Sequence, residues 1–465
     1  MHIVCIATMS LVVALFVDSA HSGDTASGLT LSDCLTIALK ENPDIKIARS
    51  RVDEVRARRN GVIAKFLPRI DLGLSYYRRG ERNAPPSKAY QLPPQNEYQA
   101  AQQYINNRFD ANVKKPSDEY YAELLMNQPL FQGGKEWGQL KSVIALLRSE
   151  EQRLDLAVRT VKLSVTRLFY ELLRTQLEYD IQRDLLEKLK EQHRIARLLY
   201  EGGKNSYVDV LKIQTQLAGA EDSMQYLQNS IVRGRLSLAR SMGMDRPVDI
   251  ARQLPAVEKN ISINTECLKN GISDNPEILY ALQTVEKLRY DELTACGGHL
   301  PTLSLKGGYS LGGYTSIKDN RFPPRYPNWY FGAAITIPIF QGNGVNAEIA
   351  EAKAKKEQAI DRLKDVRLEL AVRFQTAESA LRDSVNRLNT TEQILQYSRE
   401  TLTASELKYN AGKLSAFELL DAQTVWINAR LNYTRNIVNY RITAAELEYI
   451  CPGSVRAAAK EGDVK

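Results

Sequence analysis

Two short segments of the sequence contain the polar residues that are the best candidates for a functional role. The sequence YEGGKNSYVD spans residues 200–209 and YNAGKLSAFE spans 409–418, so both follow the pattern Tyr-x-x-Gly-Lys-x-Ser-x-x-acid. A serine followed three residues later by an acid is a capping box, which begins a helix. A glycine in the left-handed conformation ends the preceding helix, and a lysine suits the negative end of that helix. Each phrase therefore predicts a tight turn between two helices.

The remaining reactive side chains do not form a catalytic pattern. His193 falls on a predicted helix, and His299 follows Cys296 in CGGHL just before a predicted strand. The sequence has no phosphate-binding loop, no zinc-type spacing and no nucleophile elbow. We therefore expect no enzyme, no catalytic residue, no metal site and no cofactor. The net charge of +7 is spread along the chain, whereas nucleic-acid binding needs clustered basic residues, so we expect none.

The N-terminus predicts export from the cytoplasm. Residues 1–22 hold the longest apolar run of the chain, with small residues at its end, as in a cleaved signal peptide. No later segment has the roughly 18 consecutive apolar residues of a membrane-spanning helix. Cleavage leaves Cys34, Cys267, Cys296 and Cys451 without any CxxC pair, and their disulfide pairing stays open. Cys34 and Cys267 each fall inside a predicted amphipathic helix, which favours buried thiols.

The chain of 465 residues contains an internal duplication. The two turns lie 209 residues apart, and the same offset relates QPLFQGG at 128–134 to IPIFQGN at 337–343. Further upstream, Asn42-Pro43 matches Asn275-Pro276 and Leu67-Pro68 matches Leu300-Pro301, both at an offset of 233. The first repeat therefore carries about 24 extra residues between Pro68 and Pro129, which we interpret as a long polar loop.

Each repeat contains a long stretch that predicts coiled-coil helices. Residues 130–246 and 339–451 contain no proline and are rich in good helix formers. Apolar residues recur at alternating spacings of three and four, for example Leu154, Val158, Val161, Val165, Leu168 and Leu172. This narrow apolar seam is typical of a coiled coil. Two long helices joined at each turn would form a hairpin.

Four shorter segments show the period-two alternation of β-strands. They are RIDLGLSYY at 69–77, YYAELLMNQPL at 120–130, TLSLKGGYS at 302–310 and WYFGAAITIPIF at 329–340. Each has one apolar face, one small or polar face and aromatic residues near an end, as in membrane-spanning β-strands. Four strands cannot close a barrel, and lipid does not tolerate an open sheet edge. We therefore predict a homotrimer that shares one twelve-stranded barrel.

The order of these parts resembles the TolC-type outer-membrane efflux channel family. LTLSDCLTIALKENPDIKIARS, FLPRIDLGLSYY, PLFQGG and Tyr-x-x-Gly-x-x-Ser carry the resemblance, which covers roughly residues 29–450. It implies a trimeric β-barrel in the bacterial outer membrane, continued by a twelve-helix α-barrel across the periplasm. It also implies a passive channel that works with a periplasmic adaptor protein and an inner-membrane pump of the RND or ABC type.

The resemblance assigns roles to the two turns. Gly203, Lys204, Gly412 and Lys413 are expected at the adaptor-docking tip. Tyr409, Glu418 and Asp421, together with Asp209 of the first turn, are expected at the pore constriction, where Asp209 accepts a bond from Tyr409. Carboxylates around a narrow pore favour cations. For Asp209 and Glu418 the capping box is an equally good explanation, so Asp421 is the best gate residue. Leu414 stands where some members carry a locking arginine, and Lys413 is a candidate substitute.

The predicted organisation follows from the repeat and the resemblance. The segments are 1–22, signal peptide; 23–65, helices; 66–131, a strand pair with a long extracellular loop; 132–246, coiled-coil helices with the turn at 200–209; 247–299, linker and helices; 300–340, the second strand pair; 341–450, coiled-coil helices with the turn at 409–418; and 451–465, a short tail. The alternative is a periplasmic coiled-coil scaffold or adaptor, which would leave the four strands unexplained. The transported cargo depends on the pump and stays open.

Overall fold

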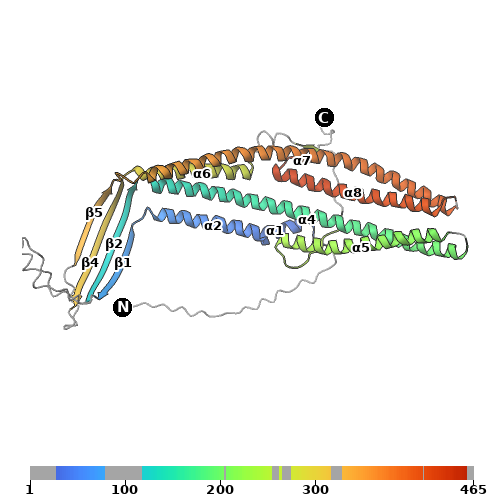
Figure 1. The fold of residues 1–465 in the computed structure, drawn as a ribbon, viewed down its shortest axis with the longest axis horizontal. Helices are drawn as coiled ribbons and strands as arrows, with labels where there is room; N and C mark the ends of the chain where they lie inside the picture. The colour runs from blue at the N-terminus through green and yellow to red at the C-terminus, as the bar shows by residue number, and fades with distance from the viewer. Residues whose placement is uncertain are drawn as a thin grey trace, which may run out of the picture. The chain divides into compact units, whose positions relative to one another are not determined.

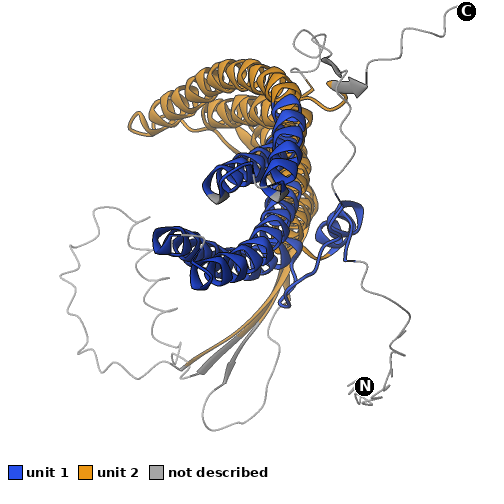
Figure 2. Ribbon diagram, turned by 90° about the vertical axis from the view of Figure 1, so that its right-hand side faces the viewer, with its two compact units in different colours: residues 1–40, 165–257, 391–438 blue, residues 41–164, 258–390, 439–465 orange. Residues whose placement is uncertain are grey.

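The computed structural model describes most of the chain and divides it into two compact units, shown in different colours in Figure 2. The described residues are 28–78, 118–203, 206–253, 261–263, 274–315, 327–411 and 413–457. The predicted signal peptide, the long loop insertion and Cys267 lie outside them. Unit 1 comprises residues 1–40, 165–257 and 391–438, and unit 2 comprises 41–164, 258–390 and 439–465.

The four predicted strands form one antiparallel sheet in unit 2. Its members are β1 (Arg69–Arg78), β2 (Asp118–Gln132), β4 (Thr302–Thr315) and β5 (Asn328–Thr336), in the order β1-β2-β4-β5 (Figure 1). The apolar side chains that alternate along β1 are exposed, from 61% for Ile70 to 75% for Leu74. Among the residues that the structure describes, nothing therefore covers the apolar side chains of this strand.

β5 is shorter than predicted, because it ends at Thr336 rather than Phe340. Thr336 lies opposite Thr302, the first residue of β4. Residues beyond Thr336 consequently have no neighbouring strand within the described chain with which to form backbone hydrogen bonds. The alternating pattern of 329–340 predicted which side chains share a face of the sheet. A β-strand also needs a neighbouring strand for its backbone hydrogen bonds, and the pattern does not predict where that neighbour ends.

The coiled-coil prediction is confirmed by four long helices. α4 (Lys135–Glu201) leads into α5 (Tyr207–Met242), and α7 (Gly344–Asn410) leads into α8 (Ala416–Ile450). Residues of the predicted seams are buried, among them Val161, Val165, Leu172, Leu370, Phe374 and Leu381. Within the described ranges, no helix is both long enough and apolar enough to cross a lipid bilayer.

Shorter helices precede the strands in each repeat. α2 (Pro43–Ala64) follows α1 (Leu31–Glu41) in the first repeat, and α6 (Pro276–Cys296) stands at the matching place in the second. Asn42 and Asn275 cap α2 and α6 by accepting hydrogen bonds from backbone N–H groups. The short pair β3 (Ile261–Ile263) and β6 (Val455–Ala457) was not predicted, because three-residue strands show no recognisable alternation.

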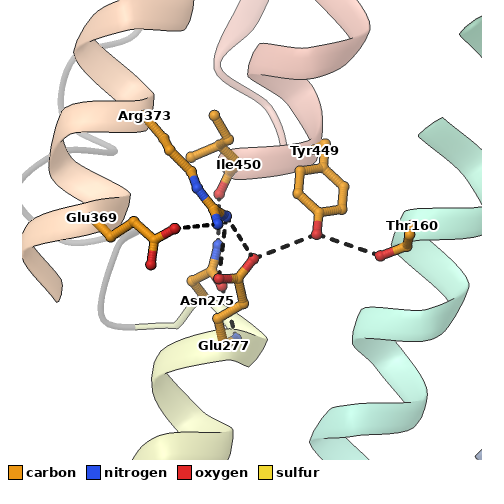
Figure 3. A network of polar contacts seen from close by, with 7 residues as sticks. All are labelled: Thr160, Asn275, Glu277, Glu369, Arg373, Tyr449 and Ile450. Carbon is orange, nitrogen blue, oxygen red and sulfur yellow. Dashed lines mark hydrogen bonds and ion pairs between the residues drawn. The ribbon is translucent and has the colours of Figure 1, made fainter. Parts of the chain in front are cut away.

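A polar network joins the start of α6 to α4, α7 and α8 within unit 2 (Figure 3). The Asn275 amide donates to the carbonyl oxygen of Ile450 at 3.0 Å, so α6 begins where α8 ends. The Glu277 carboxylate accepts from Arg373 of α7 at 3.3 Å and from the Tyr449 hydroxyl at 3.4 Å. Burial raises the pKa of Tyr449, and the Glu277 carboxylate adds to the increase, so the hydroxyl keeps its proton. Thr160 of α4 is within 3.4 Å of the same hydroxyl.

The described cysteines differ in solvent exposure and in disulfide bonding. Cys34 is a buried free thiol, and burial followed by the charge of Asp33 raises its pKa to about 11. Cys296 is also free but exposed, and Cys451 is disulfide-bonded. The expectation of a buried thiol is thus confirmed for Cys34, while Cys267 lies outside the described residues.

Candidate functional site: two helical turns in unit 1

The first turn joins α4 to α5 through a left-handed glycine. Gly203 has a φ of 71°, and its backbone N–H donates to the carbonyl oxygen of Tyr200 at 2.9 Å. Ser206 caps α5 by accepting from the N–H of Val208 at 3.2 Å. The half-buried Asp209 makes no side-chain hydrogen bond among the described residues. The predicted reciprocal capping box is therefore wrong here, and Asp209 is not held by a capping role.

The second turn, from α7 to α8, does form the complete capping box. The Lys413 N–H donates to the Lys408 carbonyl oxygen at 2.9 Å and closes the end of α7. The Glu418 carboxylate accepts from the Ser415 N–H at 2.9 Å, and the Glu418 N–H donates to the Ser415 hydroxyl oxygen at 3.3 Å. These bonds from the Ser415 backbone and hydroxyl hold the pKa of Glu418 below its usual range. Lys204 and Gly412 lie outside the described residues.

The helices that leave the two turns pack against each other within unit 1. Leu420 of α8 belongs to the same buried cluster as Val210 and Ile213 of α5. The Lys212 ammonium of α5 lies 5.0 Å from the centre of the Phe417 ring of α8. Two turns that are far apart in the sequence are thus brought to the same end of one bundle.

Asp421, like Asp209, has neither a capping role nor an ion pair among the described residues, but Asp209 is half-buried. Asp421 is exposed, and it lies three residues after Glu418 on the same face of α8. The duplication places Lys212 of the first repeat at the position of Asp421 in the second. The two turns therefore share a backbone design while their charges differ: the exposed Asp421 of the second stands where the first has Lys212.

The expected bond between Tyr409 and Asp209 does not form among the described residues. Tyr409 is half-buried and packs against a cluster of Leu402, Leu419 and Ala422. Leu414 packs against the same cluster. The residue that replaces the expected arginine is therefore part of an apolar contact, while the neighbouring Lys413 is exposed and free to meet another molecule.

An open groove of about 680 Å³ runs between α4, α7 and α8 beside these residues. Its walls carry four carboxylates and one lysine; the lining residues are Asp184, Glu187, Lys188, Glu191, Gln192, Glu406, Tyr409, Leu419, Gln423 and Trp426. Two of these carboxylates are paired with arginines, Asp184 with Arg430 at 3.0 Å and Glu191 with Arg194 at 2.6 Å, which leaves Glu187 and Glu406 as the carboxylates without a partner among the described residues.

Contacts between α4 and α8 hold the groove in shape. The Lys188 ammonium lies 5.0 Å from the centre of the Trp426 ring, and the Arg430 guanidinium lies 5.6 Å from it. Arg430 also pairs with Asp184 at 3.0 Å, while the Gln192 amide donates to Gln423 at 2.8 Å. Sequence reasoning missed these residues; a tryptophan between charged residues on a predicted helix was the available signal.

The turns present groups that can contact another protein and groups that carry charge. Within the described part of the chain, no three His, Cys, Asp or Glu side chains are grouped as metal ligands. What the turns present is a left-handed glycine, an exposed lysine, an exposed acid and an acidic groove. Such features suit contact with another protein and the attraction of cations.

Comparison with known proteins places these features in a family. The outer membrane efflux protein family matches residues 34–244 and 268–450. The chain is 21% identical to the outer membrane protein TolC of Vibrio cholerae, over 74% of this chain and 79% of TolC. It is 22% identical to the alkaline protease secretion protein AprF of Pseudomonas aeruginosa, over 92% of this chain and 85% of AprF.

Solved structures share the fold. The Campylobacter jejuni CmeC outer membrane channel aligns with a TM-score of 0.75 at 16% identity, covering 98% of this chain and 95% of CmeC. The outer membrane protein VceC of Vibrio cholerae aligns with a TM-score of 0.72 at 16% identity, covering 90% of this chain and 95% of VceC. The family match spans both repeats, including the two turns and the strands between the helices. The chain belongs to the outer membrane efflux protein family.

Proposed function

We propose that this protein is the outer-membrane exit channel of a tripartite efflux or type I secretion system. Three copies contribute four strands each to one transmembrane β-barrel, and their long helices continue the tube into the periplasm. The channel conducts passively, and an inner-membrane pump of the RND or ABC type supplies the energy through a periplasmic adaptor. Relatives include both an efflux pump outer membrane protein, TtgC of Pseudomonas putida, and the secretion protein AprF.

One observation carries the proposal: as far as the chain is described, the sheet has an exposed apolar face and two edges without a partner. Among the described strands, β1 and β5 each hydrogen-bond to one neighbour. An apolar face is compatible with lipid. Each backbone N–H or C=O group without a hydrogen-bond partner in lipid, however, costs on the order of several kcal/mol. Closure with further copies satisfies both edges. A periplasmic scaffold would need neither the apolar face nor the closure.

The two turns supply the periplasmic end of this channel. Gly203, Lys204, Gly412 and Lys413 form the proposed docking tip, so a trimer offers six related sites to adaptors. Asp421 is the proposed principal pore acid, while Glu418, Asp209 and Tyr409 complete the constriction. The free, exposed carboxylate of Asp421 supports its ranking, since Glu418 is engaged in a capping box.

Conductance measurements test the proposal against the scaffold alternative. Detergent-purified protein should insert into planar lipid bilayers and give discrete, cation-selective conductance steps. It should also migrate on gels as an oligomer until it is heated. A protein that stays soluble without detergent and leaves bilayers silent would be a scaffold.

A further inference from the structure

The two repeats differ at the place where a strand leads into a long helix, β2 into α4 and β5 into α7 (Figure 1). In the first repeat, the Phe66 ring meets the Trp137 ring edge to face, with 5.1 Å between the ring centres. By the sequence offsets, His299 stands in place of Phe66, and Asn346 stands in place of Trp137. The second repeat therefore has a polar pair where the first has an aromatic pair.

The polar pair belongs to a short chain of hydrogen bonds. The Asn346 amide donates to the Asn343 side-chain oxygen at 2.6 Å, so the Asn346 side-chain oxygen is the atom that accepts from His299 Nε2 at 3.0 Å. Asn343 has a φ of 65°, and its counterpart Gly134 has a φ of 77°. Glycine adopts this left-handed conformation more readily than asparagine. An asparagine at this position indicates that its side chain has a role.

A pocket lies beside this chain of hydrogen bonds. The corresponding pocket of the first repeat, next to Phe66 and Trp137, has a volume of about 40 Å³, whereas this one has about 270 Å³. The smaller polar side chains leave open the space that the aromatic rings fill in the first repeat. The residues of its polar wall are His299, Gln341, Asn343 and Asn346, and its apolar wall includes Ile339 and Phe340.

The polar wall suits an anion that accepts hydrogen bonds. Among the described residues that line the pocket, none is Asp or Glu. The side-chain amides of Gln341 and Asn343 have no hydrogen-bond partner within the described ranges, and the Asn346 amide has a second N–H to donate. The pocket of the first repeat differs here too, because it carries the carboxylate of Glu136, whose counterpart is Val345.

The apolar wall suits a hydrocarbon chain. Ile339 and Phe340 are 94% and 88% exposed, and the preceding Ile335 and Ile337 are 67% and 63% exposed. An exposed apolar surface therefore runs from β5 to the pocket. In the proposed channel, β5 crosses the outer membrane and α7 extends into the periplasm, so the pocket lies at the periplasmic border of the bilayer.

We propose that this pocket binds one glycerophospholipid of the periplasmic leaflet per chain. The inference rests on the proposed channel and adds a bound lipid to it. The phosphodiester oxygens accept hydrogen bonds from the amides of Gln341, Asn343 and Asn346, while an acyl chain lies along Ile339. His299 is a positioning residue, because its hydrogen bond orients the Asn346 amide. The first repeat has no equivalent site, since its aromatic pair fills the space.

Exchange of residues between the repeats tests the site in the full-length, detergent-purified protein. The double variant His299→Phe with Asn346→Trp introduces the aromatic pair of the first repeat into the second and should fill the pocket. Asn343→Gly removes one amide without straining the turn, because glycine favours the left-handed conformation. The matched control is Asn386→Ala, which removes an exposed amide from the body of α7.

Native mass spectrometry of delipidated trimers measures the uptake of added palmitoyl-oleoyl phosphatidylglycerol. The parent and the Asn386→Ala variant should bind one molecule per chain, and both pocket variants should bind about tenfold more weakly, as expected for the loss of a hydrogen bond to a charged group. Diacylglycerol, which lacks the phosphodiester, should not bind. A phospholipid with a photoreactive diazirine in its acyl chain should label residues 337–341 of the parent.

The outcomes separate the lipid site from the channel. Intact trimers that bind the phospholipid equally in all variants, or that are labelled elsewhere, overturn the site and leave the proposed channel standing. Equal binding of glycerol 3-phosphate, which has no acyl chain, overturns the lipid as the occupant. A protein that stays soluble without detergent, forms no trimers and takes up no lipid overturns the channel and the site together.

Discussion

At the scale of single residues, Asp421 is the exposed acid of the turns without a partner in the described chain, whereas Glu418 is engaged in a capping box and Asp209 is half-buried. Asp421→Asn should reduce the cation-to-anion permeability ratio by about twofold or more, since each trimer loses three pore carboxylates. Planar-bilayer reversal potentials in a salt gradient measure this ratio. Asp222→Asn, which removes an exposed acid in the body of α5, is the matched control. Equal ratios for both variants would remove Asp421 from the gate.

The thiols give a second prediction at this scale. With its pKa raised to about 11 by burial, Cys34 stays protonated at pH 8 and is shielded from reagents, whereas Cys296 is exposed. Iodoacetamide should therefore modify Cys296 in the native protein and Cys34 only after denaturation, while Cys451 needs reduction as well. Peptide mass spectrometry reads each site. Rapid native labelling of Cys34 would show that α1 does not pack as described.

At the scale of elements, the first turn depends on the left-handed conformation of Gly203. A Cβ there meets no atom within 4 Å, so Gly203→Leu is opposed by backbone strain of about 1–2 kcal/mol rather than by collision. We expect trimers to persist while export falls sharply, because the strained turn no longer presents the docking surface. Drug-susceptibility or secretion assays measure export. Gly219→Leu, an equally open glycine inside α5, should export normally; equal loss in both would refute the docking role.

The start of α6 gives a stability prediction. Asn275→Ala removes both the cap of α6 and the amide that satisfies the Ile450 carbonyl oxygen. We expect a loss of about 1–3 kcal/mol in the free energy of unfolding. Asn275→Ser keeps a capping oxygen and should lose less. Denaturant unfolding followed by circular dichroism compares the two, and equal stability of both variants with the parent would show that the network is dispensable.

Much of the element structure was predictable because local patterns determine it. Alternation placed β1, β2 and β4 correctly, and the absence of proline together with the apolar seam placed α4, α5, α7 and α8. The last residues of β5 were not predictable, because hydrogen bonding to a neighbouring strand decides them. At the turns, the Ser-x-x-acid pattern formed a full capping box at Glu418 but not at Asp209, whose side chain is one methylene shorter than the glutamate of that motif. The groove around Trp426 could not be predicted, because the sequence does not show that α4, α7 and α8 lie side by side there.

At the scale of the whole molecule, the central claim is that one chain supplies a third of a tube. The claim rests on the edges of β1 and β5, which have no further neighbour among the described strands, and on the exposed apolar face of the sheet. The resulting barrel would have twelve strands, and its periplasmic end would offer six turns to its partners.

Electron cryomicroscopy of the detergent-solubilised particle, viewed along its long axis, tests that claim most directly. The account predicts threefold symmetry around a hollow centre, with β5 of each copy adjoining β1 of the next. A particle of one chain, or an assembly without threefold symmetry or a central passage, would contradict it.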